Sequence, residues 1–435
     1  MSTLATWVEP FVEQASNQAQ NTDWLHSVRA QALERFKNEG WPTNRIEAWH
    51  HTSLMTMEKQ SYQLAADTDA STALVNEYVH SDIGYWMVFV NGRFQAQLSQ
   101  LNELPEAVQL TTVAQLLDTD PSALQDIYGK AEDGHSPDAL NLALAQDGAF
   151  VRVASGLAVE LPIHLLFVNT DAQAATFTRN FIALENGAQA TVVEHYISTA
   201  DYAGLTNAVT RVWVDQDAQL AHLKMQNQAE ACTHLGSIDA QQEKASHYES
   251  HSLSFGAQLA RTNIETALKG QHAHALLNGL YYANGRRHVD HATQIHHEQP
   301  NCTSHEYYRG VMADRGRGVF SGRIVVYEGA DGTDAIQRSD SLLLYKLARA
   351  DTRPELEIYA DDVKCAHGAT VGQIDNDSLF YLRSRGLSYE DAFNVLIYAF
   401  AAEVLGRIQS DSLRARATAA IQAVLPGAKQ IGEQS

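Results

Sequence analysis

The chain has 435 residues, of which 45% are hydrophobic and 19% are charged, so its composition is that of a globular protein and not of a disordered one. It carries 31 basic and 52 acidic residues, a formal net charge of -21, which disfavours nucleic acid and anionic membrane surfaces as partners. Its three cysteines are widely separated, which excludes a disulfide framework, a closed structural zinc site and a cluster held by four thiolates of this chain.

The two ends of the sequence give no sign of membrane targeting. The first twenty residues contain Glu9 and Glu13 and lack both a basic start and a continuous apolar core, so a secretory signal is not expected. The apolar stretch Val395–Ala402 is far too short to span a bilayer. We therefore expect a soluble, cytoplasmic protein.

Its length predicts two or three structural regions, or an elongated repeat architecture.

Residues 1–150 are expected to form a mainly helical domain. Apolar residues recur at helical spacing from Trp24 to Phe36, and Gly40 followed by Pro42 would end that helix. From residue 60 to residue 150 the pattern does not predict how the chain is organised. This segment mixes strand-like and helical stretches, such as Tyr85–Val90 and Val113–Leu117.

Residues 151–374 are predicted to form a β core, because β-branched and aromatic runs alternate with turn signals. The first runs are Phe150–Val153, His164–Val168, Phe177–Leu184, Ala190–Tyr196 and Val209–Val214. A similar turn recurs as Gly187-Ala188-Gln189, Asp217-Ala218-Gln219 and Gly256-Ala257-Gln258. The pattern favours a β-helix over a large sandwich, and the end of such a coil must be capped or paired with another chain.

Residues 375–435 are predicted to form a helical C-terminal domain. Asp375 is placed to cap a first helix that stops before Gly386. Ser388 and Asp391 form a capping box that would open a second, apolar helix. The second and third helices are expected at Ala392–Ile408 and at about Leu413–Leu425.

A histidine-rich stretch has the residue types of a metal site but not the spacing. On a strand, His288 and His291 point to opposite faces, and so do the adjacent His296 and His297. The stretch continues to Cys302 and His305. We therefore expect its histidines to be polar residues on a β surface and at an interface, and not the ligands of a metal. A metal- or carbohydrate-dependent β-helix enzyme that uses these histidines is the alternative function.

One glycine-containing pattern in the sequence resembles a nucleotide-binding loop. Gly316-x-Gly318-x-x-x-Gly322 has the wrong spacing for a dinucleotide loop, and strand-forming residues follow where a helix is needed, so a corner of the β structure is expected. No P-loop motif occurs in the sequence, so the chain should not bind ATP by itself.

The segment Ile358–Asp375 places a thiol and an imidazole two residues apart. If it continues as a strand, Cys365 and His367 share one face about 7 Å apart along the chain, and Lys364 lies on the other face. Such a pair suits a borderline-soft metal such as iron. A packed cysteine beside a hydrogen-bonded core histidine is the structural alternative.

The unbroken motif Ala360–Gly372, ADDVKCAHGATVG, resembles the SufB/SufD family of iron–sulfur assembly scaffolds. The length, the shortage of cysteines and the Cys-x-His-Gly-Ala-Thr segment favour the SufD branch. Further parts of the resemblance are Gln337, Leu342-Leu343-Leu344, Thr352–Ile358, Leu379–Gly386, Pro42-Thr43 and Glu47-Ala48-Trp49.

This resemblance implies a right-handed parallel β-helix flanked by helical domains, and a complex with SufB and two copies of the ATPase SufC. The chain would be a non-catalytic scaffold subunit that pairs with SufB through the β-helix. The C-terminal helices would dock SufC, and the apolar face of residues 388–425 is expected to exceed what capping needs and to bind it. The amount of homodimer formed without SufB stays open.

The resemblance also assigns the site. A transient iron–sulfur cluster would form at the SufB–SufD interface, where His367 would lie opposite a SufB cysteine. Cys365 would be a second ligand to the metal or would only pack. A purely architectural subunit, in which both residues tolerate replacement, is a further alternative, and whether reduced flavin binds in the complex stays open.

Overall fold

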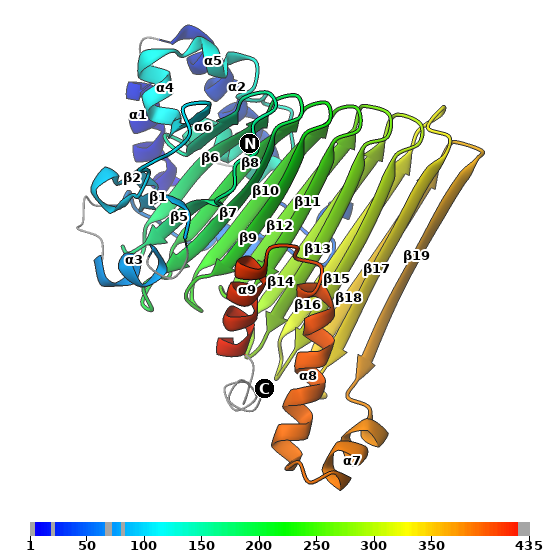
Figure 1. The fold of residues 1–435 in the computed structure, drawn as a ribbon. Helices are drawn as coiled ribbons and strands as arrows, with labels where there is room; N and C mark the ends of the chain where they lie inside the picture. The colour runs from blue at the N-terminus through cyan, green and yellow to red at the C-terminus, as the bar shows by residue number, and fades with distance from the viewer. Residues whose placement is uncertain (1–4, 19–21, 66–71, 80–82, 425–435) are drawn as a thin grey trace.

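The computed structural model describes residues 5–18, 22–65, 72–79 and 83–424. The chain winds into a parallel β-helix of two facing sheets, with helices packed outside them (Figure 1). From β4 onward, successive strands alternate between the sheets, so each turn of the coil adds one strand to each. The first sheet has the order β2-β1-β5-β7-β9-β11-β13-β15-β17-β19, and the second has the order β3-β4-β6-β8-β10-β12-β14-β16-β18. The predicted β-helix is thus confirmed.

The helical elements are η1 Thr6–Val8, α1 Glu9–Gln18, α2 Asp23–Glu39, η2 Glu47–Trp49, η3 Met55–Lys59, α3 Thr72–Val79, η4 Ala96–Leu98, α4 Val113–Thr119, α5 Ser122–Gln125, α6 Ser136–Leu144, α7 Asn376–Ser384, α8 Tyr389–Leu405 and α9 Asp411–Val424. The early strands are β1 Tyr85–Val90, β2 Arg93–Phe94, β3 Val108–Thr112, β4 Ala149–Val153, β5 Ile163–Asn169, β6 Ala175–Leu184, β7 Gln189–Ser198, β8 Leu205–Val214, β9 Gln219–Asn227 and β10 Thr233–Gln242. The later strands are β11 His247–Ser254, β12 Leu259–Leu268, β13 His274–Ala283, β14 His288–His297, β15 Thr303–Met312, β16 Arg317–Val326, β17 Thr333–Leu343, β18 Arg349–Ile358 and β19 Val363–Gln373.

The corners of the coil carry residues with left-handed backbone conformations. Gly187, Asp217 and Ala257, which belong to the recurring turn predicted from the sequence, have φ values of 69°, 57° and 68°. A positive φ is uncommon for residues other than glycine and is typical of tight turns. These corners end one strand and redirect the chain into the opposite sheet.

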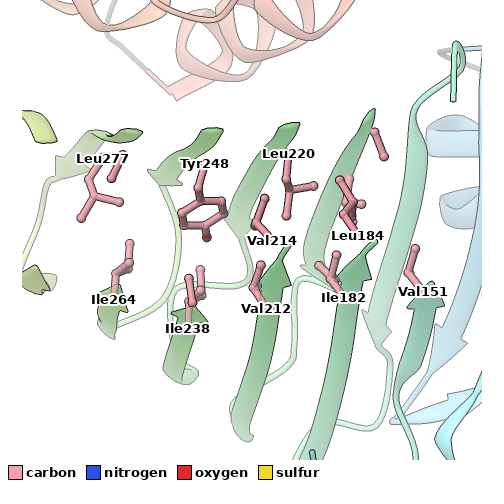
Figure 2. Packing of buried hydrophobic residues seen from close by; sticks show 14 of the residues in the cluster. Val151, Ile182, Leu184, Val212, Val214, Leu220, Ile238, Tyr248, Ile264 and Leu277 are labelled. Atoms are coloured by element: carbon pink, nitrogen blue, oxygen red, sulfur yellow. The ribbon is translucent and has the colours of Figure 1, made fainter. Parts of the chain in front are cut away.

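The interior of the coil is closed by ladders of apolar side chains (Figure 2). Val151, Ile182, Val212, Ile238 and Ile264 come from successive strands of the second sheet and lie in a row. Three residues of the first sheet, Leu220, Tyr248 and Leu277, face this row. Parallel pairing places Val151, Ile182 and Val212 in register with one another, and Ile238 in register with Ile264. Between β8 and β10 the row moves by two residues, because Val212 is in register with Ala240. Full burial of one such side chain stabilises the fold by roughly 1.5–3 kcal/mol.

The N-terminal region covers the outer face of the second sheet. Its α-helices other than α3 share a buried apolar cluster with Phe177 and Phe181 of β6 and Leu205 of β8, whereas α3 packs on β1 and β5 of the first sheet. The segment with the N-terminal family motif reaches further along the coil, because Arg261 of β12 lies over the Trp49 ring at 3.8 Å. Glu47 in this segment forms an ion pair with Arg353 of the last strand of the second sheet. The motif therefore fastens the N-terminal region to the far end of the coil.

Residues 60–150, whose organisation the sequence did not predict, contribute to both layers. β1 pairs in parallel with β5 and extends the first sheet, and β3 pairs antiparallel with β4 at the start of the second. The helices α4–α6 pack in the N-terminal cluster. The predicted strand Tyr85–Val90 is confirmed with the same bounds.

The C-terminal helices α8 and α9 lie against the outer face of the first sheet (Figure 1). The buried residues of this contact are Ile397, Ala401, Val404, Leu405, Ile408, Leu413, Ala417 and Ile421 from the C-terminal segment, and Val193, Leu223, Met225, Leu253, Phe255, Leu280, Tyr282, Val311, Ala313 and Leu342 from the first sheet and the ends of its strands. Part of the apolar face of residues 388–425 therefore covers the sheet, whereas Val395, Leu396 and Tyr398 of α8 stay partly exposed, and the binding of a partner to this face stays a prediction. The sheet itself needs this cover, since its outer face is apolar here; Leu425 lies outside the described residues.

The helix caps expected in the C-terminal region are present. The Asp375 carboxylate accepts from the backbone N–H groups of Asp377 and Ser378, and the Ser388 hydroxyl accepts from that of Asp391. No helix in the described ranges combines the length and the apolar character that crossing a bilayer requires.

Candidate functional site

The histidines of the 288–305 stretch are separated by the coil wall. His288 and His296 lie outside, where their Nε2 atoms are 2.7 Å from the Thr52 hydroxyl and 3.1 Å from the Glu265 carboxylate. His291 and His297 are fully buried inside. The predicted divergence of neighbouring histidines is thus confirmed, but the prediction of a surface location is wrong for His291 and His297. They occupy the inward positions of β14 and contact serine hydroxyls, at 2.8 Å from Ser304 for His297.

The glycines of the 316–322 pattern were expected at a corner. Gly316 does lie in the turn before β16, but Gly318 and Gly322 lie within that strand, so the prediction is wrong for these two. These two glycines are needed because a side chain at either position would collide with a neighbour. A Cβ on Gly318 would lie 2.6 Å from the Tyr281 ring, and a Cβ on Gly322 would lie 2.3 Å from Nε2 of Gln337. Inward side chains of the opposite sheet need this space.

The last turn of the coil, formed by β18 and β19, is here called the open end. Each of these strands is the terminal strand of its sheet and pairs on one side only, β18 with β16 and β19 with β17. Most of β19 is exposed, and a Cβ added at Gly368 or Gly372 would meet no neighbour within 4 Å. Such an edge can accept further strands.

Cys365 and His367 lie on β19 at the open end. Cys365 packs, partly buried, against the apolar interior, as does Val363 two residues earlier. Since side chains alternate along a strand, His367 shares the inward face with Cys365, as the sequence predicted, and it is exposed. The structure thus places the accessible imidazole of His367 at the open end of the coil. The Cys365 thiol lies two residues earlier on the same face and is more buried.

All three thiols of this chain have raised pKa values. Burial, reinforced by the nearby Asp334 carboxylate, raises the pKa of Cys365. Burial also raises the pKa of Cys302, and it raises that of Cys232 to about 12. Because metals bind the thiolate, each of the three thiols would have to lose a proton first.

The sequence pattern did not single out Glu306, a carboxyl group on the inward face of the first sheet. Glu306 of β15 is fully buried, and its Oε2 accepts a hydrogen bond of 2.6 Å from Nε2 of Gln337. Burial raises the pKa of Glu306 to about 7. One signal for it was present: in Ser304, Glu306 and Tyr308 an acidic residue takes an inward position of a strand, where an apolar residue is the rule.

The raised pKa of Glu306 predicts a pH-dependent stability. The folded chain holds this proton up to about pH 7, whereas the unfolded chain releases it near the ordinary value of 4.5. The unfolded state therefore binds fewer protons in this window, and the free energy of unfolding falls as the pH rises. The total is roughly 3 kcal/mol, at about 1.4 kcal/mol per pKa unit. Glu306→Gln should remove this dependence, so its stability relative to the parent should rise by that amount between about pH 4.5 and pH 7.5.

Urea unfolding of both proteins at the two pH values measures the difference. Glu298→Gln, which alters an exposed carboxylate in the turn after β14, is the matched control and should follow the parent. Parallel pH curves for Glu306→Gln and the parent would contradict the prediction.

A groove of about 1050 Å³ lies over the second sheet, beside the N-terminal segments at residues 46–48 and 130–138. Neither Cys365 nor His367 lines it. Two of its arginines are paired with carboxylates of this chain, Arg211 with Asp133 and Asp239, and Arg323 with Glu357. The groove reaches the outer face of β18 through Arg353, Glu355 and Glu357, but it does not include the two candidate ligands of β19.

Comparison with known proteins identifies the family. Residues 167–400 match the model described as SUF system FeS cluster assembly, SufBD core domain, and residues 1–165 match the SufBD protein N-terminal region. The chain belongs to the SufBD family. It is 31% identical to the iron–sulfur cluster assembly protein SufD of Escherichia coli over 91% of this chain and 92% of that protein. It is 27% identical to SufD of Bacillus subtilis over 95% and 97%, and 30% identical to a SufBD family protein of Synechocystis sp. over 93% and 92%.

The SufBD match agrees with the resemblance seen in the sequence and, within the family, with SufD. Both family regions coincide with parts of the structure described above. The N-terminal match ends at the start of β5, and the core match covers the remaining coil and most of α8. The open end, with Cys365 and His367, lies inside the SufBD core region.

Proposed function

We propose that this chain is a non-catalytic scaffold subunit for de novo iron–sulfur cluster assembly, acting with SufB and the ATPase SufC. Membership of the SufBD family and similarity to SufD support the role in cluster assembly. The observation that carries the proposal further is the position of His367, exposed on the inward face of a terminal strand that pairs on one side only. A ligand in that position is available to a group held between two chains.

SufB is the proposed partner at the open end. Both sheets end there with unpaired strand edges, so a partner of the same fold can continue the two sheets through β18 and β19. Val371, which is 49% exposed on β19, would be covered by such pairing. The same surface would support a homodimer of this chain when SufB is absent.

The nascent cluster would form between this chain and SufB at the open end, with His367 as one ligand to iron. A neutral imidazole suits iron, and the thiolates would come from SufB, because two of the three cysteines here are fully buried. For Cys365, the contact with the apolar interior and the raised pKa favour packing over ligation. It stays the second candidate ligand of this chain.

SufC is proposed to dock on α7 and the start of α8. Here an aromatic patch formed by Phe380, Tyr381 and Tyr389 remains uncovered, with exposed fractions of 73%, 56% and 55%. Arg383 and Arg385 lie over the rings of Tyr389 and Tyr381. Exposed aromatic residues with neighbouring arginines are typical of the centres of protein interfaces. ATP hydrolysis would reside in SufC.

A reduced flavin in the complex stays a prediction. The groove over the second sheet has a volume that a flavin could occupy, about 1050 Å³. Four of the five arginines that line it, Arg211, Arg261, Arg323 and Arg353, form ion pairs with carboxylates of this chain. We therefore place no flavin-binding residue in this subunit.

Reconstitution with purified partners tests the proposal. The complete chain should neither hydrolyse ATP nor keep a stoichiometric cluster by itself, whereas its complex with SufB and SufC should form clusters when supplied with iron, sulfide and ATP. Omission of this chain should lower the rate of cluster formation. A persistent, stoichiometric cluster in the single chain, or an unchanged rate without it, would contradict the proposal.

A further inference from the structure

Three side chains on the inward face of the first sheet form a row that leads to the open end. Glu306 of β15 pairs in register with Gln337 of β17, and Gln337 pairs in register with His367 of β19. Register partners in a parallel sheet are about 4.8 Å apart and point to the same side. Glu306 and Gln337 are 0% and 1% exposed, whereas His367 is exposed. The row therefore runs from the closed interior to the imidazole at the mouth of the coil.

The orientation of the Gln337 amide is determined by its inner neighbour. Nε2 of Gln337 donates to Oε2 of Glu306. The other terminal atom of the amide, the oxygen Oε1, is therefore not the one that contacts this carboxyl oxygen. This Oε1 atom is buried and has no hydrogen-bond partner within the described ranges. A buried carbonyl is normally paired with a donor, and the register partner of Gln337 on the outer side is His367 of this same chain.

The opposite sheet leaves room for this arrangement. Gly322 of β16 faces the amide, and a Cβ there would lie 2.3 Å from Nε2 of Gln337. A side chain at position 322 would displace the amide from its place between Glu306 and the open end. The glycine is therefore part of the same arrangement.

We propose that Gln337 is a positioning residue for His367: its Oε1 accepts from one imidazole N–H and leaves the other ring nitrogen free to bind iron. Glu306 holds the amide in this orientation. Metal-binding histidines commonly donate their second N–H to an oxygen acceptor, which selects the tautomer and the ring direction. The inference rests on the proposed function of His367 as a ligand.

The test uses the complete chain assembled with SufB and SufC and compares three variants. Gln337→Met removes the acceptor at similar length, and Gln337→Glu retains an acceptor in the same place. Gln242→Met is the matched control, because the Gln242 amide is also buried and donates to the His274 carbonyl at 2.9 Å, on other turns of the coil. Two readouts are measured: the rate of cluster formation, and the tautomer of His367 from the ring ¹⁵N shifts in solid-state NMR.

We expect Gln337→Met to lower the rate by about tenfold, as is typical when the partner of a metal-binding histidine is lost, and to mix the two tautomers. Gln337→Glu should recover most of the rate and a single tautomer, and Gln242→Met should match the parent. A parental rate and a single tautomer in Gln337→Met would overturn the inference. So would an unaltered chain whose His367 already populates both tautomers, which settles the matter even if Gln337→Met fails to fold.

The two proposals fail in different ways. If His367→Ala forms clusters at the parental rate, the proposed function of His367 is wrong, and the positioning role falls with it. If His367→Ala is inactive but Gln337→Met behaves as the parent in both readouts, the positioning inference alone is wrong.

Discussion

Replacing His367 with alanine should abolish or severely reduce cluster formation by the assembled complex. The loss should exceed the roughly 10- to 100-fold that follows from removing the partner of a ligand, since the ligand itself is removed. Folding should be largely unaffected, because the imidazole is exposed on the last strand and contributes little to the core. The growth of iron–sulfur absorbance in the reconstituted complex measures the rate, and light scattering of the purified complex measures assembly.

Two variants complete this experiment. His247→Ala removes an exposed imidazole from β11 of the same sheet, on the outer face, and should form clusters as the parent does. Cys365→Ser should have a smaller effect than His367→Ala, because Cys365 packs against the apolar interior. Parental cluster formation in both site variants would support the purely architectural subunit. Loss of SufB binding in His367→Ala would make His367 a residue of the subunit contact.

The double change Phe380→Ala and Tyr381→Ala should weaken SufC binding by at least about 30-fold. Aromatic residues at the centre of an interface commonly contribute 2 kcal/mol or more each, and about 1.4 kcal/mol corresponds to a tenfold change in affinity. The thermal stability of the chain should stay close to that of the parent, because both side chains are more than half exposed. Titration calorimetry with purified SufC measures the affinity.

Met55→Ala, at a residue that is 53% exposed in the N-terminal region, is the matched control and should bind SufC as the parent does. Unchanged affinity in the double variant would exclude the aromatic patch as the docking site. A deletion after Gly386 would be a poor substitute for these changes. It would remove α8 and α9 and expose Leu253, Leu280 and the other apolar residues that they cover on the first sheet.

The sequence by itself determined the class of fold and the local geometry of the site. Alternating strands with small residues at the corners predicted the β-helix, and the side-chain period of two placed Cys365 and His367 on one face. The same period separated His288 from His291. The helix caps at Asp375 and Ser388 were also readable, because a cap depends on residues within one turn of the helix.

The tertiary structure decided which residues meet across turns and which faces are covered. Glu306, Gln337 and His367 are about 30 residues apart in sequence and form a row only because successive turns pair without a register shift. No local pattern encodes that register, since it depends on the length of every turn and corner between the strands. For the same reason, an apolar face on α8 could be recognised from the sequence, but its partner could not. That partner is the outer face of the first sheet, whose apolar side chains come from strands that are far apart in the chain.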